Sequence, residues 1–156
     1  MAKATFGAGC FWGVEARFAQ VPGVTATAVG YEGGKLDNPS YHDVCTDATG
    51  HAEVVELDYD PSKVSYEQLL DLFFELHDPT QLNRQGPDWG TQYRSVIFYH
   101  SPEQEAAAKQ VIARLTEEKR FRKPVVTQVV PAKTFWRAEE HHQKYLEKRG
   151  AVSCHI

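Results

Sequence analysis

The chain has 156 residues, of which 42% are hydrophobic and 24% charged, and its 17 Lys and Arg against 21 Asp and Glu give a formal net charge of −4 at pH 7. These values are typical of one globular domain and exclude a collagen-like, coiled-coil or disordered chain. The longest apolar runs, such as residues 96–99, are far shorter than the roughly 20 residues of a membrane span, and no basic face suited to nucleic acid is present, so we expect neither partner.

The predicted elements alternate between strands and helices. Residues 3–6 form a short predicted strand that leads through a Gly-rich turn into a helix over 11–20, which ends before Pro22 and Gly23. Ser65 and Gln68 form a capping box at the start of the next helix, and Ser101 and Gln104 form a second one. The other predicted elements are strands over 25–31, 53–59, 93–99 and 125–130, and a last helix over 137–148.

This order of elements predicts an α+β two-layer sandwich with a ferredoxin-like core, in which helices pack on a mostly antiparallel sheet. Two long loops, 32–51 and 81–89, interrupt it, and long ordered loops are often functional. We expect residues 1–148 to form one catalytic domain and residues 149–156 to form a mobile tail.

The three cysteines, Cys10, Cys45 and Cys154, are too few and too widely spaced for a secreted disulfide framework. An odd count leaves at least one free thiol, which suits a reducing compartment, and the first 13 residues resemble mature sequence more than a signal peptide. The sequence therefore predicts a cytoplasmic protein with reduced thiols.

Cys10 has the strongest argument for chemistry. It follows the turn of residues 7–9 and immediately precedes a predicted helix, where unpaired backbone N–H groups and the positive end of the helix dipole favour a thiolate. The other interpretation is a small buried residue without reactivity. Cys154 lies in the expected tail, where a thiol can reach a reactive one and resolve it; Cys45 has no basic neighbour closer than His42, and we expect it to be structural.

Glu53 is the second candidate. It alternates in step with Val55, Leu57 and Tyr59, so its carboxyl should point toward the packed face, where burial raises a carboxyl pKa and makes it a proton donor at neutral pH. The alternative is a side chain that bends into water at the strand end.

Several other polar residues lie beside the loops. Each of them alone is weak evidence for a functional site: Tyr31, Tyr41, Tyr93 and Asp88. Tyrosines in particular are normally packing residues. The set His42, Cys45 and His51 has no fourth ligand at ordinary spacing, so we expect no metal site.

The motifs taken together resemble one family. They are GCFWG at 9–13, GYEGG at 30–34, NPSY at 38–41, GHAE at 50–53, HDPTQ at 77–81, NRQG at 83–86, GTQYRS at 90–95 and FWRAEEHHQ at 135–143. In this order, over about residues 5–147, they resemble the A-type peptide methionine sulfoxide reductases, whose two-layer α+β fold agrees with the predicted elements.

The resemblance implies roles for the candidate residues. Cys10 matches the catalytic nucleophile, and Glu53, Tyr41 and Tyr93 match the groups that bind and protonate the sulfoxide oxygen. Cys154 resembles the C-terminal resolving cysteine, which attacks a sulfenic acid on Cys10 to form a disulfide that thioredoxin reduces.

Three further residues match substrate-binding positions. Phe11 and Trp12 match the aromatic pocket for the substrate's S-methyl group, and Asp88 matches a residue that positions the substrate. The resemblance also implies the S epimer of methionine sulfoxide, a monomer, and thioredoxin as reductant, and this chemistry requires no metal or organic cofactor.

The sequence departs from the family pattern at two places. Glu32 stands where the GYEGG motif usually has a small residue, and the tail carries Cys154 alone where many relatives have two cysteines. Two other functions remain open from the residues: a thiol hydrolase with His51 as base, and a module whose Trp12 pocket only binds methionine-containing peptides.

Overall fold

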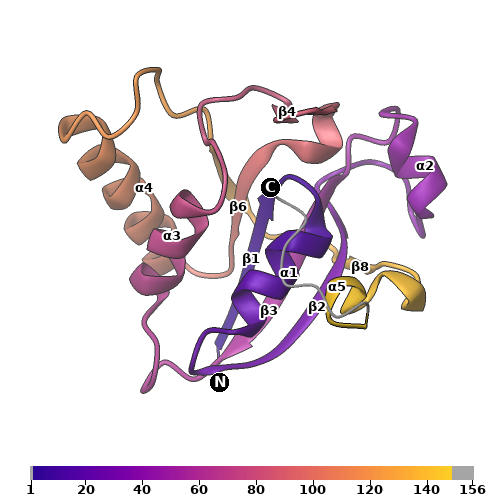
Figure 1. The fold of residues 1–156 in the computed structure, drawn as a ribbon, viewed down its shortest axis with the longest axis horizontal. Helices are drawn as coiled ribbons and strands as arrows, with labels where there is room; N and C mark the ends of the chain where they lie inside the picture. Colours follow the sequence, from indigo (N-terminus) through magenta and orange to yellow (C-terminus); the bar gives the residue numbers. More distant parts are fainter. Residues whose placement is uncertain (1, 149–156) are drawn as a thin grey trace.

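The computed structural model describes residues 2–148, whose centre is a six-stranded sheet (Figure 1). Its strands lie in the order β7-β6-β1-β3-β2-β8, and a separate hairpin is formed by β4 and β5. The strands are β1 Ala2–Ala8, β2 Val24–Glu32, β3 Ala52–Tyr59, β4 Arg84–Gln85, β5 Asp88–Trp89, β6 Ser95–Tyr99, β7 Gln128–Pro131 and β8 Trp136–Arg137.

The helices connect these strands. They are α1 Phe11–Ala19, α2 Tyr41–Cys45, α3 Tyr66–Glu75, α4 Pro102–Glu117 and α5 Tyr145–Lys148, with 3-10 turns η1 Thr91–Tyr93 and η2 Glu140–His142. The capping box of Ser65 and Gln68 at the start of α3 is confirmed. Within the described residues, no helix is both long and apolar enough to cross a membrane.

The core of the sheet has a ferredoxin-like arrangement. The elements β1-α1-β2-β3-α3-β6 follow one another in the chain, and the four strands lie in the order β6-β1-β3-β2 with every neighbouring pair antiparallel. Strand β7 then adds in parallel to β6, connected through α4. The predicted α+β class with a mostly antiparallel sheet is therefore confirmed.

The main core lies between the sheet and helices α1, α3 and α4. Phe6 of β1 is its centre, with ring centroids 5.2 Å from both Phe18 of α1 and Phe73 of α3. The opposite face of the sheet has a smaller apolar cluster that includes Val96 and Phe98 and is covered by the segment around residues 130–135. Burial of aromatic rings supplies the largest apolar areas, so these rings hold α1 and α3 against β1.

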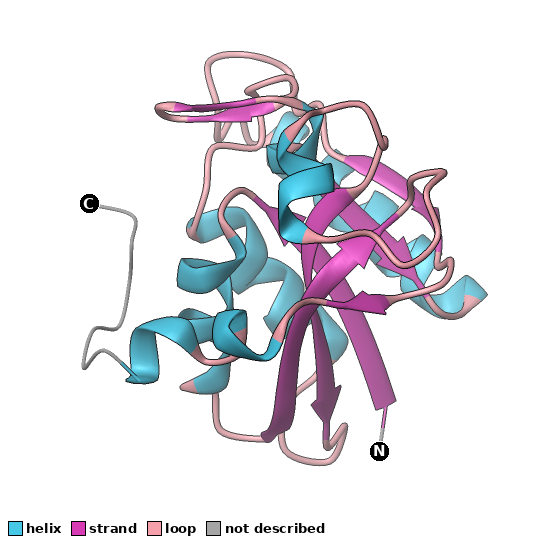
Figure 2. Ribbon diagram, turned by 90° about the vertical axis from the view of Figure 1, so that its right-hand side faces the viewer, coloured by secondary structure: helices cyan, strands magenta, loops and turns pink. Residues whose placement is uncertain are grey.

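The long connections gather at one end of the sheet. Strands β1 and β2 end there, β3 begins there, and Tyr31 pairs with Glu53 while Ala8 pairs with Ser95. Figures 1 and 2 show the β4–β5 hairpin and α2 at this same end. The predicted loops 32–51 and 81–89 are thus close in space, although the first contains α2 and the second contains the hairpin.

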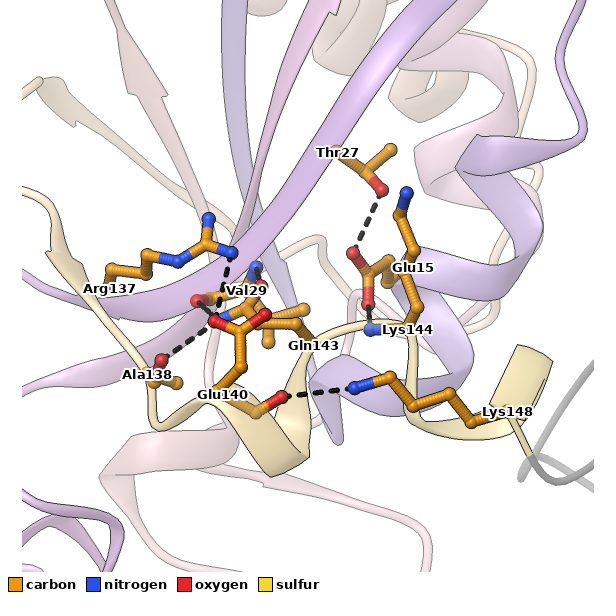
Figure 3. A network of polar contacts seen from close by, with 9 residues as sticks. All are labelled: Glu15, Thr27, Val29, Arg137, Ala138, Glu140, Gln143, Lys144 and Lys148. Carbon is orange, nitrogen blue, oxygen red and sulfur yellow. Dashed lines mark hydrogen bonds and ion pairs between the residues drawn. The ribbon is translucent and has the colours of Figure 1, made fainter.

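The predicted helix over 137–148 is wrong. This segment is β8, η2 and the single turn α5, because polar side chains tie its backbone to β2 and α1 (Figure 3). The side-chain amide of Gln143 accepts from the N–H of Val29 at 2.9 Å and donates to the carbonyls of Val29 at 2.8 Å and Ala138 at 2.9 Å. Lys144 has a positive φ of 53° and its N–H donates to Glu15, so the helix cannot continue through it.

Three smaller differences also have local causes. Strand β6 begins at Ser95, because Tyr93 belongs to the 3-10 turn η1. The predicted strand over 125–130 is β7, which begins at Gln128. At the start of α4, Ser101 caps the helix as expected, but the Gln104 side chain accepts from the N–H of His100, so only half of the capping box forms.

Candidate active site

Cys10 lies at the junction between β1 and α1. Gly9 before it has a φ of +94°, a conformation that favours glycine, and this turn directs the chain from the strand into the helix. Cys10 itself is the N-cap residue of α1 and is half-buried. The expected position at a helix N-terminus is confirmed, and the positive end of the helix dipole there favours negative charge on the sulfur.

Glu53 lies beside this junction on β3. It is 1% exposed, and its Oε1 accepts a hydrogen bond from the backbone N–H of Phe11 at 3.3 Å. The expected inward orientation is confirmed, because Glu53 bonds to α1 and Val55 and Leu57 of the same strand belong to the core cluster that α1 covers. One oxygen of the carboxyl therefore contacts the first turn of the helix that Cys10 caps.

Tyr41 and Tyr93 approach Glu53 from the two long connections. Burial raises the pKa of both hydroxyls, and the nearby charge of Glu53 raises each further. Cys10 contributes to the raised pKa of Tyr93 in the same way, which places that hydroxyl near both candidates. Both tyrosines are thus neutral hydrogen-bond donors at ordinary pH.

Glu139 fixes two of the tyrosines. Its Oε1 accepts from the hydroxyl of Tyr31 at 2.9 Å, and its Oε2 accepts from the backbone N–H of Tyr41 at 3.0 Å. Burial acts to raise the pKa of Glu139, but these hydrogen bonds outweigh it and the pKa is lowered. Glu139 therefore links Tyr31 of β2 to the start of α2.

An aromatic cluster stands next to the thiol. The indole N–H of Trp12 donates to Nδ1 of His142 at 3.0 Å, and the Trp12 ring stacks on Tyr145 with centroids 3.9 Å apart. Tyr41 packs on His142 at 4.5 Å, and Phe11 on His142 at 5.5 Å. Burial lowers the pKa of His142, assisted by the neighbouring His141, so the ring is neutral and can accept the indole hydrogen bond.

A cavity of about 640 Å³ opens at Cys10 and is called here the Cys10 cavity. Its size is within the usual range of small-molecule sites. It brings together three of the predicted residues, Cys10, Trp12 and Asp88. The rest of its lining is Leu76, His77, Asp78, Gln81, Gln85, Gly86 and Pro87.

The other predicted residues are placed as follows. Four of them lie at or near the N-terminus of α1 but are not part of the lining of the Cys10 cavity. They are Glu53, Tyr41, Tyr93 and Phe11. Cys154 lies outside the described residues.

Three residues of the site have no role predicted from the sequence: Glu139, His142 and Tyr145. Glu139 and His142 lie in the polar run EEHH at 139–142, inside the segment that the sequence predicts to be a regular helix. The actual path, fixed by Gln143, turns these side chains toward α1 and α2.

His51 is not available as a base for Cys10. It is 2% exposed, its Nδ1 accepts from the N–H of Gly34 at 3.0 Å, and its Nε2 lies 2.6 Å from the carbonyl oxygen of Leu36. Both ring nitrogens therefore hold the loop after β2. Among residues 2–148, no three His, Cys, Asp or Glu side chains are grouped so that they could hold a metal ion.

Comparison with known proteins gives the same family. The sequence matches the family described as peptide methionine sulfoxide reductase over residues 2–156. A peptide methionine sulfoxide reductase MsrA of Acidobacterium capsulatum is 75% identical over 156 residues, covering all of both chains.

Solved structures are also similar. The reduced form of Mxr1 from Saccharomyces cerevisiae is 35% identical with a TM-score of 0.89, over 96% of this chain and 86% of that one. Methionine sulfoxide reductase A of Corynebacterium diphtheriae is 38% identical with a TM-score of 0.85, over 98% and 77%. Mxr1 in complex with Trx2, at 23% identity and a TM-score of 0.63 over 92% and 84%, shares the fold. The chain therefore belongs to the peptide methionine sulfoxide reductase family of oxidoreductases.

Proposed function

We propose that this chain reduces methionine S-sulfoxide, in proteins, peptides or free, to methionine, and so repairs oxidised proteins in the cytoplasm. The observation that carries the proposal is the junction of β1 and α1. There a half-buried cysteine occupies the N-cap position of α1, and the carboxyl of Glu53 contacts the backbone N–H of the next residue. A nucleophile and a buried acid side by side are what sulfoxide reduction needs, because the oxygen must be protonated as it leaves sulfur.

Binding is assigned to the residues around the Cys10 cavity. Phe11 and Trp12 hold the S-methyl group, since apolar rings fit a methyl and Trp12 is fixed by His142 and Tyr145. Asp88 of β5, which lines the same cavity as Trp12, positions the rest of the substrate. The choice of the S epimer follows from family membership.

The first step transfers oxygen from the substrate to Cys10. The thiolate attacks the sulfoxide sulfur while Glu53, with the hydroxyls of Tyr41 and Tyr93, donates hydrogen bonds and a proton to the oxygen. The net reaction converts the Cys10 thiol and a sulfoxide into a Cys10 sulfenic acid and a thioether. Methionine leaves, and no metal or organic cofactor takes part.

The second stage returns Cys10 to the thiol. The Cys154 thiol attacks the Cys10 sulfenic acid, and the new disulfide forms with loss of one water. A thioredoxin dithiol then reduces that disulfide and becomes a disulfide itself. The solved complex of Mxr1 with Trx2 supports a thioredoxin as this partner.

A coupled assay tests the proposal. Purified protein is given resolved S- or R-sulfoxide substrate with thioredoxin, thioredoxin reductase and NADPH, and methionine release is measured together with NADPH consumption. We expect both with the S epimer alone, and neither in Cys10→Ser. If sulfoxide peptides bind but no methionine forms with thioredoxin or dithiothreitol, the protein is a binding module and the proposal is wrong.

A further inference from the structure

A second cavity, of about 740 Å³, adjoins the Cys10 cavity. It lies between the end of α3 with the loop that follows it and the turn after α4. Four residues line both cavities, so the two share one wall. They are Leu76, His77, Asp78 and Gln81. The two cavities are therefore adjacent, and an extended substrate chain is long enough to reach from one to the other.

This second cavity is positively charged, and it is called here the basic cavity. Arg84, Arg120, Arg122 and Lys123 line it, in a protein whose formal net charge is −4. Among residues 2–148, none of these four cations forms an ion pair with a carboxylate. The sequence of residues 119–123 alone predicts a solvated turn, because it does not show that Arg84 lines the same cavity.

The acidic residues of the same lining offset only part of the charge of the four cations, because two carboxylates against four cations leave a net charge of +2. Glu75 and Asp78 are the two carboxylates of the basic cavity. Asp78 is turned to its own loop, where Oδ1 accepts from the backbone N–H and the hydroxyl of Thr80 at 3.0 and 2.6 Å. The surplus positive charge is therefore available to a ligand of opposite sign.

The rim has the composition of a protein-binding surface. Leu82 in the lining and Trp89 on the hairpin are each 67% exposed, although both are large and apolar. The guanidinium of Arg84 lies 4.1 Å above the centroid of the Trp89 ring. Exposed tryptophan, arginine and leucine side chains next to a cavity mark sites of protein contact.

We propose that the basic cavity binds an acidic segment of the oxidised protein, next to the methionine sulfoxide that occupies the Cys10 cavity. This inference rests on the proposed function, and it makes Arg84, Arg120, Arg122 and Lys123 determinants of substrate choice. The substrate is favoured over a separate partner because four residues line both cavities, so the basic cavity lies next to the Cys10 cavity. An extended segment covers about 10 Å in three residues, so the acidic residues stand a few positions from the sulfoxide.

Peptide kinetics test the inference. Each peptide has one central methionine S-sulfoxide and carries glutamates, lysines or glutamines at positions two to five on one side of it, and both sides are tried. Wild-type protein should have a lower KM for the glutamate peptide than for the lysine peptide on one side, with a ratio of about ten. The ratio should shrink as NaCl is raised, because salt screens exposed charges.

The Arg120→Gln/Arg122→Gln double variant should lose most of the preference for the glutamate peptide. Each removed cation should lower the ratio of the two KM values by about two- to fivefold. Both side chains are exposed, so their loss leaves the core packing intact. The matched control is Arg17→Gln/Lys63→Gln, which removes the same charge from exposed positions near the other end of the sheet and should keep the full ratio. All values are divided by those for the neutral C-terminal amide of N-acetylmethionine S-sulfoxide, whose reduction reports on the proposed function alone.

Three results would overturn the inference while leaving the proposed function in place. They are equal KM values for the three peptides in the wild type, an unchanged ratio in the Arg120→Gln/Arg122→Gln variant, and a rise of the KM for thioredoxin alone in that variant. Failure of the wild-type protein to reduce the amide of N-acetylmethionine S-sulfoxide would instead contradict the proposed function.

Discussion

Glu53 shows how a single carboxyl can be prepared for sulfoxide chemistry. The sheet shields it from water, β2 pairs with its strand at Tyr31, and the Phe11 N–H holds one of its oxygens. A sulfoxide oxygen becomes a good leaving group only when it is protonated, so the position of an acid beside the thiol matters more than its strength. In the proposed mechanism Glu53 has this role and the two tyrosines assist it.

Glu53→Gln should lower kcat strongly and KM weakly. Glutamine can still accept the hydrogen bond from Phe11, but it cannot supply a proton, so we expect kcat for an S-sulfoxide peptide to fall by roughly 10²–10⁴-fold. Steady-state kinetics measure the loss, and circular dichroism checks the fold. Glu56→Gln, three residues along the same strand, is the control and should keep kcat within about twofold of the wild-type value. A Glu53→Gln enzyme with wild-type kcat would show that the acid lies elsewhere.

His142 fixes Trp12 without contacting the reacting atoms in the proposed mechanism. Burial lowers the pKa of His142, so its Nδ1 remains an acceptor for the indole at neutral pH. Replacing it by Phe keeps a ring in the cluster but removes that acceptor.

His142→Phe should therefore raise KM for a sulfoxide peptide by about two- to tenfold, the equivalent of one hydrogen bond, with a smaller change in kcat. His141→Phe changes the exposed neighbouring histidine and is the matched control. Equal KM values in the two variants would mean that the hydrogen bond does not position Trp12. In the wild type KM should also rise as the pH falls through the lowered pKa of His142, and this rise should be absent from His142→Phe.

At the scale of elements, the end of β2 carries an unusual carboxyl. Glu32 is 1% exposed, and its Oε2 accepts from the N–H of Lys133 at 2.9 Å, while Oε1 has no hydrogen-bond partner among the described residues. Burial raises the pKa of Glu32 to about 7, against the lowering effect of the Lys133 N–H. The folded protein thus holds this proton at pH values where the unfolded chain has lost it.

Stability should consequently fall as the pH rises. Between pH 4.5 and 7 the folded state binds more protons at Glu32 than the unfolded state, which makes the free energy of unfolding decrease with pH. From pH 5 to pH 8 the wild type should lose roughly 2–3 kcal/mol more than Glu32→Gln, as measured by urea unfolding. Asp37→Asn, at an exposed position in the loop after β2, should follow the wild type. Parallel stability curves for wild type and Glu32→Gln would contradict this account of the buried carboxyl.

The elements that the sequence predicts well are those with a strong local signal. Alternation of Val55, Leu57 and Tyr59 gave β3 and the inward direction of Glu53, and the capping box of Ser65 and Gln68 gave the start of α3. The segment 137–148 was predicted wrongly because its path depends on distant partners. The bonds from Gln143 to Val29 connect residues 114 positions apart, and no local pattern contains them.

For the whole molecule, the site depends on bringing distant segments to one end of the sheet. Cys10 and Asp88 are far apart in sequence but line one cavity, which the sequence suggested only through the family resemblance. The neutral state of Tyr41 and Tyr93 and the role of Glu139 depend on burial and on contacts between connections, so they required the fold.

The proposed return of Cys10 to the thiol also joins distant parts of the sequence, because Cys154 lies 144 positions after Cys10. Cys154→Ser should release one methionine per chain and then stop with thioredoxin as reductant, since the Cys10 sulfenic acid has no resolving thiol. Cys45→Ser is the matched control and should turn over, because burial raises the pKa of Cys45 and leaves it a weak nucleophile. Methionine release over time measures both variants. Full thioredoxin-dependent turnover by Cys154→Ser would exclude its resolving role.

The most direct test of the central claim, attack by Cys10 on the sulfoxide, is a single-turnover experiment on Cys154→Ser. The protein is mixed with an excess of S-sulfoxide peptide and no reductant, then treated with dimedone, which traps sulfenic acids, and analysed by mass spectrometry together with the methionine peptide formed. We predict one methionine peptide per chain and a dimedone adduct on Cys10. Methionine formation with Cys10 unmodified, or equal formation by Cys10→Ser/Cys154→Ser, would contradict the mechanism.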